Sequence, residues 1–117
     1  MTYSELFTYC MSKPFVEETY PFGPENVVFK VAGKMFAICG IDDPDFVNLK
    51  CDPERAIELR LNHPDDITPG YHMSKKHWNS VVLNGMLPTL QILELVDHSY
   101  DLVVESLPKK TRLDLGL

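Results

Sequence analysis

The chain has 117 residues, a length that suits one domain with its own hydrophobic core, and we expect residues 1–117 to fold as a single unit. Hydrophobic residues make up 44% and charged residues 24%, an ordinary globular composition that excludes a disordered or fibrous chain. The formal net charge is −6, from 11 Lys and Arg against 17 Asp and Glu, so binding to nucleic acid or to an anionic membrane requires a local basic patch.

The first residues predict a short helix. Thr2 and Glu5 form a capping box, in which each side chain accepts a hydrogen bond from a free backbone donor of the first turn. Apolar residues then recur at helical spacing up to Cys10, and Pro14 sets the end of the helix. Residues 17–26 are rich in turn-forming residues and predict a loop.

Three strands are predicted next. Residues 27–31 and 34–38 are joined at Ala32-Gly33, which is short enough for a tight hairpin. The sequence IDDPD predicts a turn, and residues 46–51 predict the third strand. These strands mix apolar and polar positions, which indicates a sheet with one buried face.

The second half begins with a strong helix signal, because Asp52 can cap the helix that Pro53 starts. Tyr100 and Val103 belong to the apolar stripe of the longest predicted helix, so we expect both to be buried. The short tail after Pro108 is expected to pack late or to fray. In this second half the sequence predicts a helix from Pro53 that ends at 62–64, an irregular segment over 65–77, a strand over 78–83 and a helix over 89–107.

The order of these elements favours an α+β fold, with an antiparallel sheet covered on one face by the first and last helices. The sequence has no Gly-rich loop between a strand and a helix, which argues against a nucleotide-binding α/β fold. The three cysteines are widely spaced and form no Cys-x-x-Cys pair, so we expect reduced thiols in a cytoplasmic protein. Cys39 and Cys51 lie on or beside predicted strands, so we expect these two to be buried and inert. No apolar run is long enough to span a membrane and no signal peptide is expected.

The motifs of common enzyme and metal sites are absent from the sequence. Asp42, Asp43 and Asp45 lack the glycine and the distal glutamate of a calcium loop, so a solvated turn is the better interpretation. His72 and His77 are five residues apart, which does not place them on one face of a helix. We therefore expect no catalytic residues, no metal site and no cofactor.

One segment stands out by its charge. Residues 67–93 contain no Asp or Glu, and within them lies the sequence YHMSKKHW, from Tyr71 to Trp78. Lys75 and Lys76 supply charge for phosphate contacts, His72 and His77 supply hydrogen bonds, and Trp78 can stack on a base. The alternative interpretation is that Trp78 is a core residue and the lysines form a solvated turn.

The segments SELFTYCMSKP, NLKCDPERAIEL and PGYHMSKKHWNSVVLNGMLP resemble the MmcQ/YjbR family of small bacterial proteins. The most specific part is the pattern His-x-x-Lys-x-His-Trp at His72, Lys75, His77 and Trp78, followed by Asn-Gly and Leu-Pro pairs. The resemblance extends from about Thr2 to Pro108.

The resemblance implies a two-layer sandwich like that of frataxin and CyaY, and a DNA-binding function in which two hairpins act as wings. On this chain the wings are residues 27–38, with Lys30 and Lys34, and residues 67–83, with Lys75 and Lys76. Lys50 lies on the strand between them. Because Lys30 and Lys34 are four residues apart, alternation predicts that they share one side of the sheet. The iron binding of frataxins does not carry over, because the first helix has only one acidic residue, and the capping box uses it.

Two functions follow from the sequence. The first is DNA binding through the basic and aromatic residues, and the second is binding of a small ligand or a protein partner by the same surface. The position of the lysines separates them, because one continuous positive face favours DNA and scattered lysines favour the alternative. The residues assigned to nucleic-acid binding are Lys30, Lys34, Lys50, His72, Lys75, Lys76, His77 and Trp78.

Overall fold

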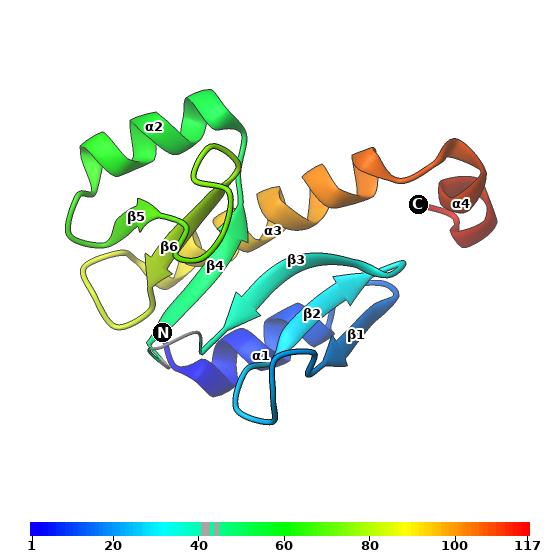
Figure 1. Cartoon of the computed structure of the whole chain (residues 1–117), viewed down its shortest axis with the longest axis horizontal. Coiled ribbons are helices and arrows are strands. Elements are labelled where there is room, and N and C mark those ends of the chain that lie inside the picture. The colour runs from blue at the N-terminus through cyan, green and yellow to red at the C-terminus, as the bar shows by residue number, and fades with distance from the viewer. Residues whose placement is uncertain (41–42, 44) are drawn as a thin grey trace.

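The structure is a computed structural model that describes residues 1–40, 43 and 45–117. It has one six-stranded antiparallel sheet in the order β1-β2-β3-β4-β6-β5, with helices on one face, which confirms the predicted α+β fold (Figure 1). The elements are α1 (Tyr3–Met11), β1 (Val16–Thr19), β2 (Val28–Val31), β3 (Lys34–Cys39), β4 (Phe46–Lys50), α2 (Pro53–Asn62), β5 (Ile67–Pro69), β6 (Trp78–Val82), α3 (Thr89–Ser106) and α4 (Lys109–Leu115).

The local signals at two helix starts are confirmed. Thr2 and Glu5 form both bonds of the capping box, with N–H donors at 3.0 and 3.1 Å. The Asp52 carboxylate accepts a bond of 3.1 Å from the Arg55 N–H at the start of α2, and α2 ends at Asn62 with His63 as its C-cap. Both helices therefore begin where their capping residues predict.

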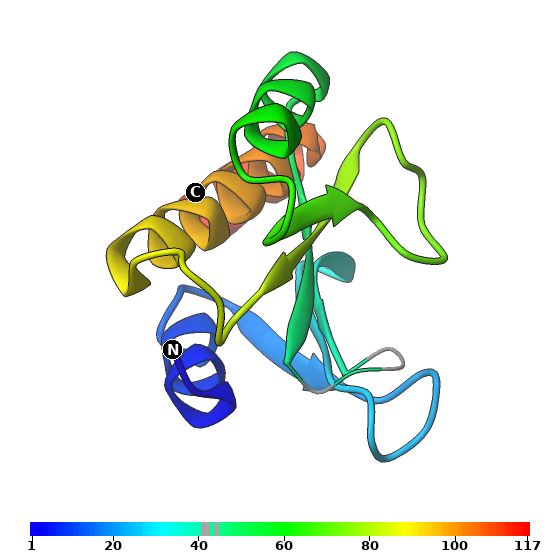
Figure 2. The ribbon, with the colours of Figure 1, turned by 90° about the vertical axis from the view of Figure 1, so that its left-hand side faces the viewer.

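The core lies between the sheet and the helices. α3 packs on β2, β3 and β4, and α1 packs beside β1, so these two helices cover one face of the sheet. Tyr100 and Val103 are buried, as the helical stripe predicts, with 6% and 1% of their surface exposed. We call the face of the sheet away from these helices the open face, and Figure 2 shows loops on that side where the other side has helices.

Three segments differ from the sequence prediction. Residues 16–19 form an edge strand at the start of the predicted loop, and residues 67–69 form a second edge strand within the predicted irregular segment. Edge strands this short have little local signal, because partner strands supply their hydrogen bonds. The tail folds as α4 and does not fray, and Leu117 packs against the core. Ile41, Asp42 and Pro44 of the predicted turn lie outside the described residues.

No helix in the described part of the chain has the length and apolar character needed to cross a membrane.

Candidate functional site

A row of side chains crosses the open face. Residues directly opposite each other on neighbouring antiparallel strands share a face. Lys30 lies opposite Met35, and Lys50 lies opposite Trp78. Trp78 packs with Val28 and Ile38 in a small apolar cluster that is separate from the core under the helices. Lys30 and Lys50 are therefore on the open face, two strands apart, which is about 10 Å at ordinary strand spacing.

Lys34 lies on the other face, so its predicted place beside Lys30 is wrong. The two-residue turn at Ala32-Gly33 places Lys34 opposite Val31, a core residue under the helices. The Lys34 ammonium donates to the Ser106 carbonyl at 3.4 Å, at the C-terminal end of α3. Alternation along one strand reverses when the chain passes through a two-residue turn, which is why the spacing of four misled the prediction.

The basic and aromatic residues form a loop between β5 and β6, which we call the 70–77 loop after its residues. Lys75, Lys76, His72 and His77 are all exposed, as DNA contact would require. Figure 2 shows this loop, in yellow-green, projecting from the sheet on the side away from the helices. It thus lies on the same side of the sheet as Lys30 and Lys50.

Trp78 is buried, with only 8% of its surface exposed, whereas residues 74–77, which precede it in the loop, are exposed. Met73 of the loop packs against the apolar cluster that Trp78 forms. Tyr71 is 52% exposed, and its ring centroid lies 4.0 Å from that of His72. The prediction that Trp78 can stack on a base is therefore wrong, because Trp78 is buried beneath the loop, and Tyr71 is an exposed aromatic ring of the loop.

Buried polar groups hold the loop to the open face. The Ser80 hydroxyl donates to the side-chain oxygen of Asn48 and accepts a hydrogen bond of 3.1 Å from the backbone N–H of Tyr71. The side-chain amide of Asn48 donates in turn to the backbone carbonyl of Tyr71 at 3.2 Å. Asn48 and Ser80 are only 4% and 3% exposed. These residues were missed from the sequence because single polar residues inside strands carry no local signal. Arg60 of α2, whose side chain donates to the Lys75 and Trp78 carbonyls, was also missed because its partners are 15 and 18 residues away.

Gly70, the first residue of the 70–77 loop, lies in close contact with Trp78. Its N–H donates to the Trp78 carbonyl at 2.8 Å, and an added Cβ would lie 2.7 Å from the Trp78 Cβ. That separation is shorter than real Cβ contacts, so only glycine fits without a shift of the backbone. The two ends of the 70–77 loop are therefore held together where β5 ends and β6 begins.

The three cysteines are buried in the structure. Burial raises the pKa of the Cys10 thiol to about 12 and that of Cys51 to about 11, and it also raises the pKa of Cys39. Thiols of this kind are protonated at neutral pH and react slowly. Cys39 and Cys51 are thus buried as the sequence predicted, with 1% and 4% of their surface exposed.

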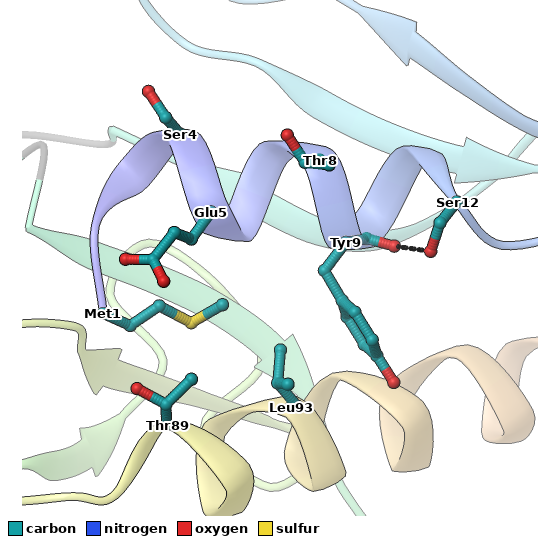
Figure 3. A pocket seen from close by; sticks show the side chains of 8 residues that line it. All are labelled: Met1, Ser4, Glu5, Thr8, Tyr9, Ser12, Thr89 and Leu93. Carbon is teal, nitrogen blue, oxygen red and sulfur yellow. Dashed lines mark hydrogen bonds between the residues drawn. The ribbon is translucent and has the colours of Figure 1, made fainter.

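A shallow groove of about 500 Å³ lies between α1 and the first turns of α3, lined by Met1, Glu5, Tyr9 and Leu93 among others (Figure 3). Two of its polar side chains, Glu5 and Tyr9, are already hydrogen-bonded. Glu5 belongs to the capping box, and the Tyr9 hydroxyl donates to Asp97 at 2.6 Å. Among residues 1–40, 43 and 45–117, no three His, Cys, Asp or Glu side chains are placed to hold a metal ion.

The comparisons with known proteins decide the family. The model of the YjbR family matches residues 11–102, which is most of the chain. This chain belongs to the YjbR family. The Escherichia coli K12 protein described as uncharacterized protein YjbR is 41% identical over 113 residues, which cover 96% of this chain and 95% of that protein. The Bacillus subtilis protein YyaQ, also described as uncharacterized, is 38% identical over 77 residues, which cover 66% and 64%.

Solved structures of YjbR-like proteins share the fold. A crystal structure of Deinococcus radiodurans protein DR2400, described with the domain DUF419, has a TM-score of 0.92 and 43% identity and covers 99% of this chain and 88% of that one. A Pseudomonas syringae protein has a TM-score of 0.71 and 28% identity, covering 87% and 98%. The α+β fold of this chain is therefore shared with these two bacterial proteins.

Proposed function

We propose that this YjbR-family protein binds DNA through the open face of its sheet and the 70–77 loop. The observation that carries the proposal is that four lysines lie on one side of the sheet. Lys30 and Lys50 lie on the open face, and Lys75 and Lys76 are exposed in the loop that projects from the same side. Lysine ammonium groups that gather on one side can neutralise several phosphates together.

The distribution of acidic charge supports the same surface. α3 carries Glu94, Asp97, Asp101 and Glu105 and has no Lys or Arg, and it lies on the opposite side of the sheet. On β1, Glu17 lies opposite Lys30 and is an acidic group on the open face. The four carboxylates of α3 are thus separated from the four lysines by the sheet, whereas Glu17 is on the same side as the lysines.

The width of the sheet indicates how DNA would be contacted. Six strands at about 4.8 Å spacing span about 24 Å, twice the ~12 Å width of the major groove. The sheet cannot enter a groove, so Lys30 and Lys50 would contact phosphates. The narrow 70–77 loop is the part that can approach base edges. We therefore propose binding dominated by phosphate contacts, with little dependence on DNA sequence.

The test replaces both Lys75 and Lys76 by Ala and measures binding to duplex DNA over a series of salt concentrations. We expect weaker binding for every duplex sequence, and a slope of log affinity against log salt that falls by about 1 for each lost contact. The matched control replaces Lys109 and Lys110 of α4 by Ala, because these two exposed lysines are also adjacent but lie far from the loop.

Two results would overturn the proposal. One is the absence of duplex binding by the unmodified protein at low salt. The other is an equal loss of affinity in the two double variants, which would mean that only total charge matters. Either result would favour the alternative function, in which the same surface binds a small ligand or a protein.

The proposal also makes this protein a binding protein and not an enzyme. Its support is that the groove between α1 and α3 has bonded polar groups and that the thiols have raised pKa values because of burial. Iodoacetamide should leave all three cysteines unmodified in the folded protein at pH 7.5. Rapid modification of one of them would point to an activated nucleophile.

A further inference from the structure

One side chain from outside the sheet reaches the 70–77 loop. The Arg60 guanidinium of α2 donates from Nε to the Asn79 side-chain oxygen at 2.7 Å. A terminal nitrogen of the same group donates to the Trp78 carbonyl at 3.3 Å and also to the Lys75 carbonyl. Asn79 is 2% exposed, so the Nε side of the guanidinium is partly buried against β6, whereas its bond to Lys75 is exposed.

We infer that Arg60 is a positioning residue that fixes the 70–77 loop in the conformation that binds DNA, and that it does not contact the DNA itself. The functional half of this inference rests on the proposed function. The structural half, that Arg60 holds the loop, stands independently of any ligand.

The partners of Arg60 are unusual for a charged group. The ion pairs seen among the described residues join Lys13 to Asp97 and Arg55 to Glu94, and neither involves Arg60. Arg60 instead satisfies its donors with neutral oxygens, two of which are backbone carbonyls at the C-terminal end of the loop. A guanidinium presents several donors in a rigid planar arrangement, so it can hold separate acceptors in one geometry.

The loop is held from the other side as well. Asn48 and Ser80 bind the Tyr71 backbone from the open face, whereas Arg60 binds the Lys75 and Trp78 carbonyls from α2. Both ends of the loop are thus fixed to the sheet by side chains distant in sequence. The side chains of Lys75 and Lys76 remain exposed although the backbone of the loop is held.

This arrangement matters for binding because ordering a loop upon association reduces affinity. Lys75 supplies its side chain to the proposed DNA surface and its carbonyl to Arg60. The backbone from which Lys75 and Lys76 project is therefore ordered before DNA arrives. Without Arg60, every phosphate contact should remain possible. The loop would then have to become ordered each time the protein binds DNA, which should lower the affinity.

The test compares Arg60→Lys and Arg60→Gln with the control Arg55→Lys, which alters another arginine of α2 that pairs with Glu94 and not with the loop. Hydrogen exchange of the amides of residues 73–78 should accelerate about tenfold or more in both Arg60 variants. The melting temperature and the exchange of α3 amides should change little. Arg55→Lys should leave the loop amides unchanged.

DNA binding gives the second measurement. We expect the Arg60 variants to bind duplex DNA several-fold more weakly, with a slope against salt equal to that of the unmodified protein. Arg60→Lys keeps the positive charge but loses the planar set of donors that holds the loop. We therefore expect that Arg60→Lys does not rescue binding. A purely electrostatic role would predict that rescue.

Each contrary result has a distinct meaning. A slope that falls by about 1 in Arg60→Gln would make Arg60 a phosphate contact and overturn the inference. Unchanged loop exchange would also overturn it. Failure of the unmodified protein to bind DNA would overturn the proposed function, and with it the functional half of the inference, while the exchange measurement would still decide whether Arg60 holds the loop.

Discussion

The Ser99 hydroxyl donates a hydrogen bond of 2.5 Å to the carbonyl of Phe36, and it accepts one of 2.9 Å from the Lys50 N–H. The register of β2 and β3 shifts next to Phe36, and the paired residues of β3 and β4 end at Ala37 and Leu49. Ser99 of α3 therefore satisfies backbone groups of two strands where their own pairing stops.

We predict that Ser99→Ala destabilises the protein by about 3 kcal/mol, because it leaves a buried carbonyl and a buried N–H without partners. Urea denaturation measures the change. Ser106→Ala, on the exposed end of the same helix, should cost less than about 0.5 kcal/mol. Similar losses in the two variants would show that water replaces the Ser99 hydroxyl.

Val103 tests the buried stripe of α3. Val103→Asp places a charge where only 1% of the side chain is exposed, so we expect a loss above about 4 kcal/mol, enough to unfold many domains. Circular dichroism and thermal denaturation measure the loss. Leu90→Asp near the exposed start of the same helix is the control and should remain folded. A folded Val103→Asp protein of normal stability would contradict the packing of α3.

The opposite faces of Lys30 and Lys34 give a sharp test of the proposed DNA surface. Lys30→Ala should lower the slope of log affinity against log salt by about 1, because Lys30 lies on the open face. Lys34→Ala should leave the slope unchanged, since Lys34 reaches the end of α3 on the other side. Equal slopes in the two variants would mean that the open face is not the contact surface.

His98 predicts a loss of stability in mild acid. Its Nε2 accepts a bond of 3.2 Å from the Asp52 N–H, so it must be unprotonated there. Burial lowers the pKa of His98, and the nearby Arg55 lowers it further. The folded state therefore binds the proton less well than the unfolded chain. The stability contributed by neutral His98 is present above pH ~6.5 and is lost as the pH falls through its lowered pKa.

The measurement compares urea midpoints at pH 7.5 and pH 5.5 for the unmodified protein and for His98→Gln, which cannot titrate. The unmodified protein should lose more stability than the variant over this interval. If the two lose the same amount, the acid sensitivity lies elsewhere in the protein.

The sequence determined the parts of the fold that depend on neighbouring residues. The capping residues Thr2 and Asp52 set the starts of α1 and α2, because a cap acts within three residues of itself. The stripe that includes Tyr100 and Val103 set the buried side of α3, because helical spacing repeats along a long element. The composition of residues 71–78 also indicated the basic segment of which residues 74–77 are exposed, whereas only the structure showed that Trp78 is buried.

Tertiary structure alone decided which residues share a surface. Lys34 left the open face because a two-residue turn reverses the alternation, and β1 and β5 became strands because neighbouring strands supply their partners. Arg60 lies 15 residues from Lys75 in sequence, and Asn48 lies 23 residues from Tyr71. Their hydrogen bonds arise only after the sheet has formed, because local preferences act over a few residues whereas these contacts need distant segments brought together.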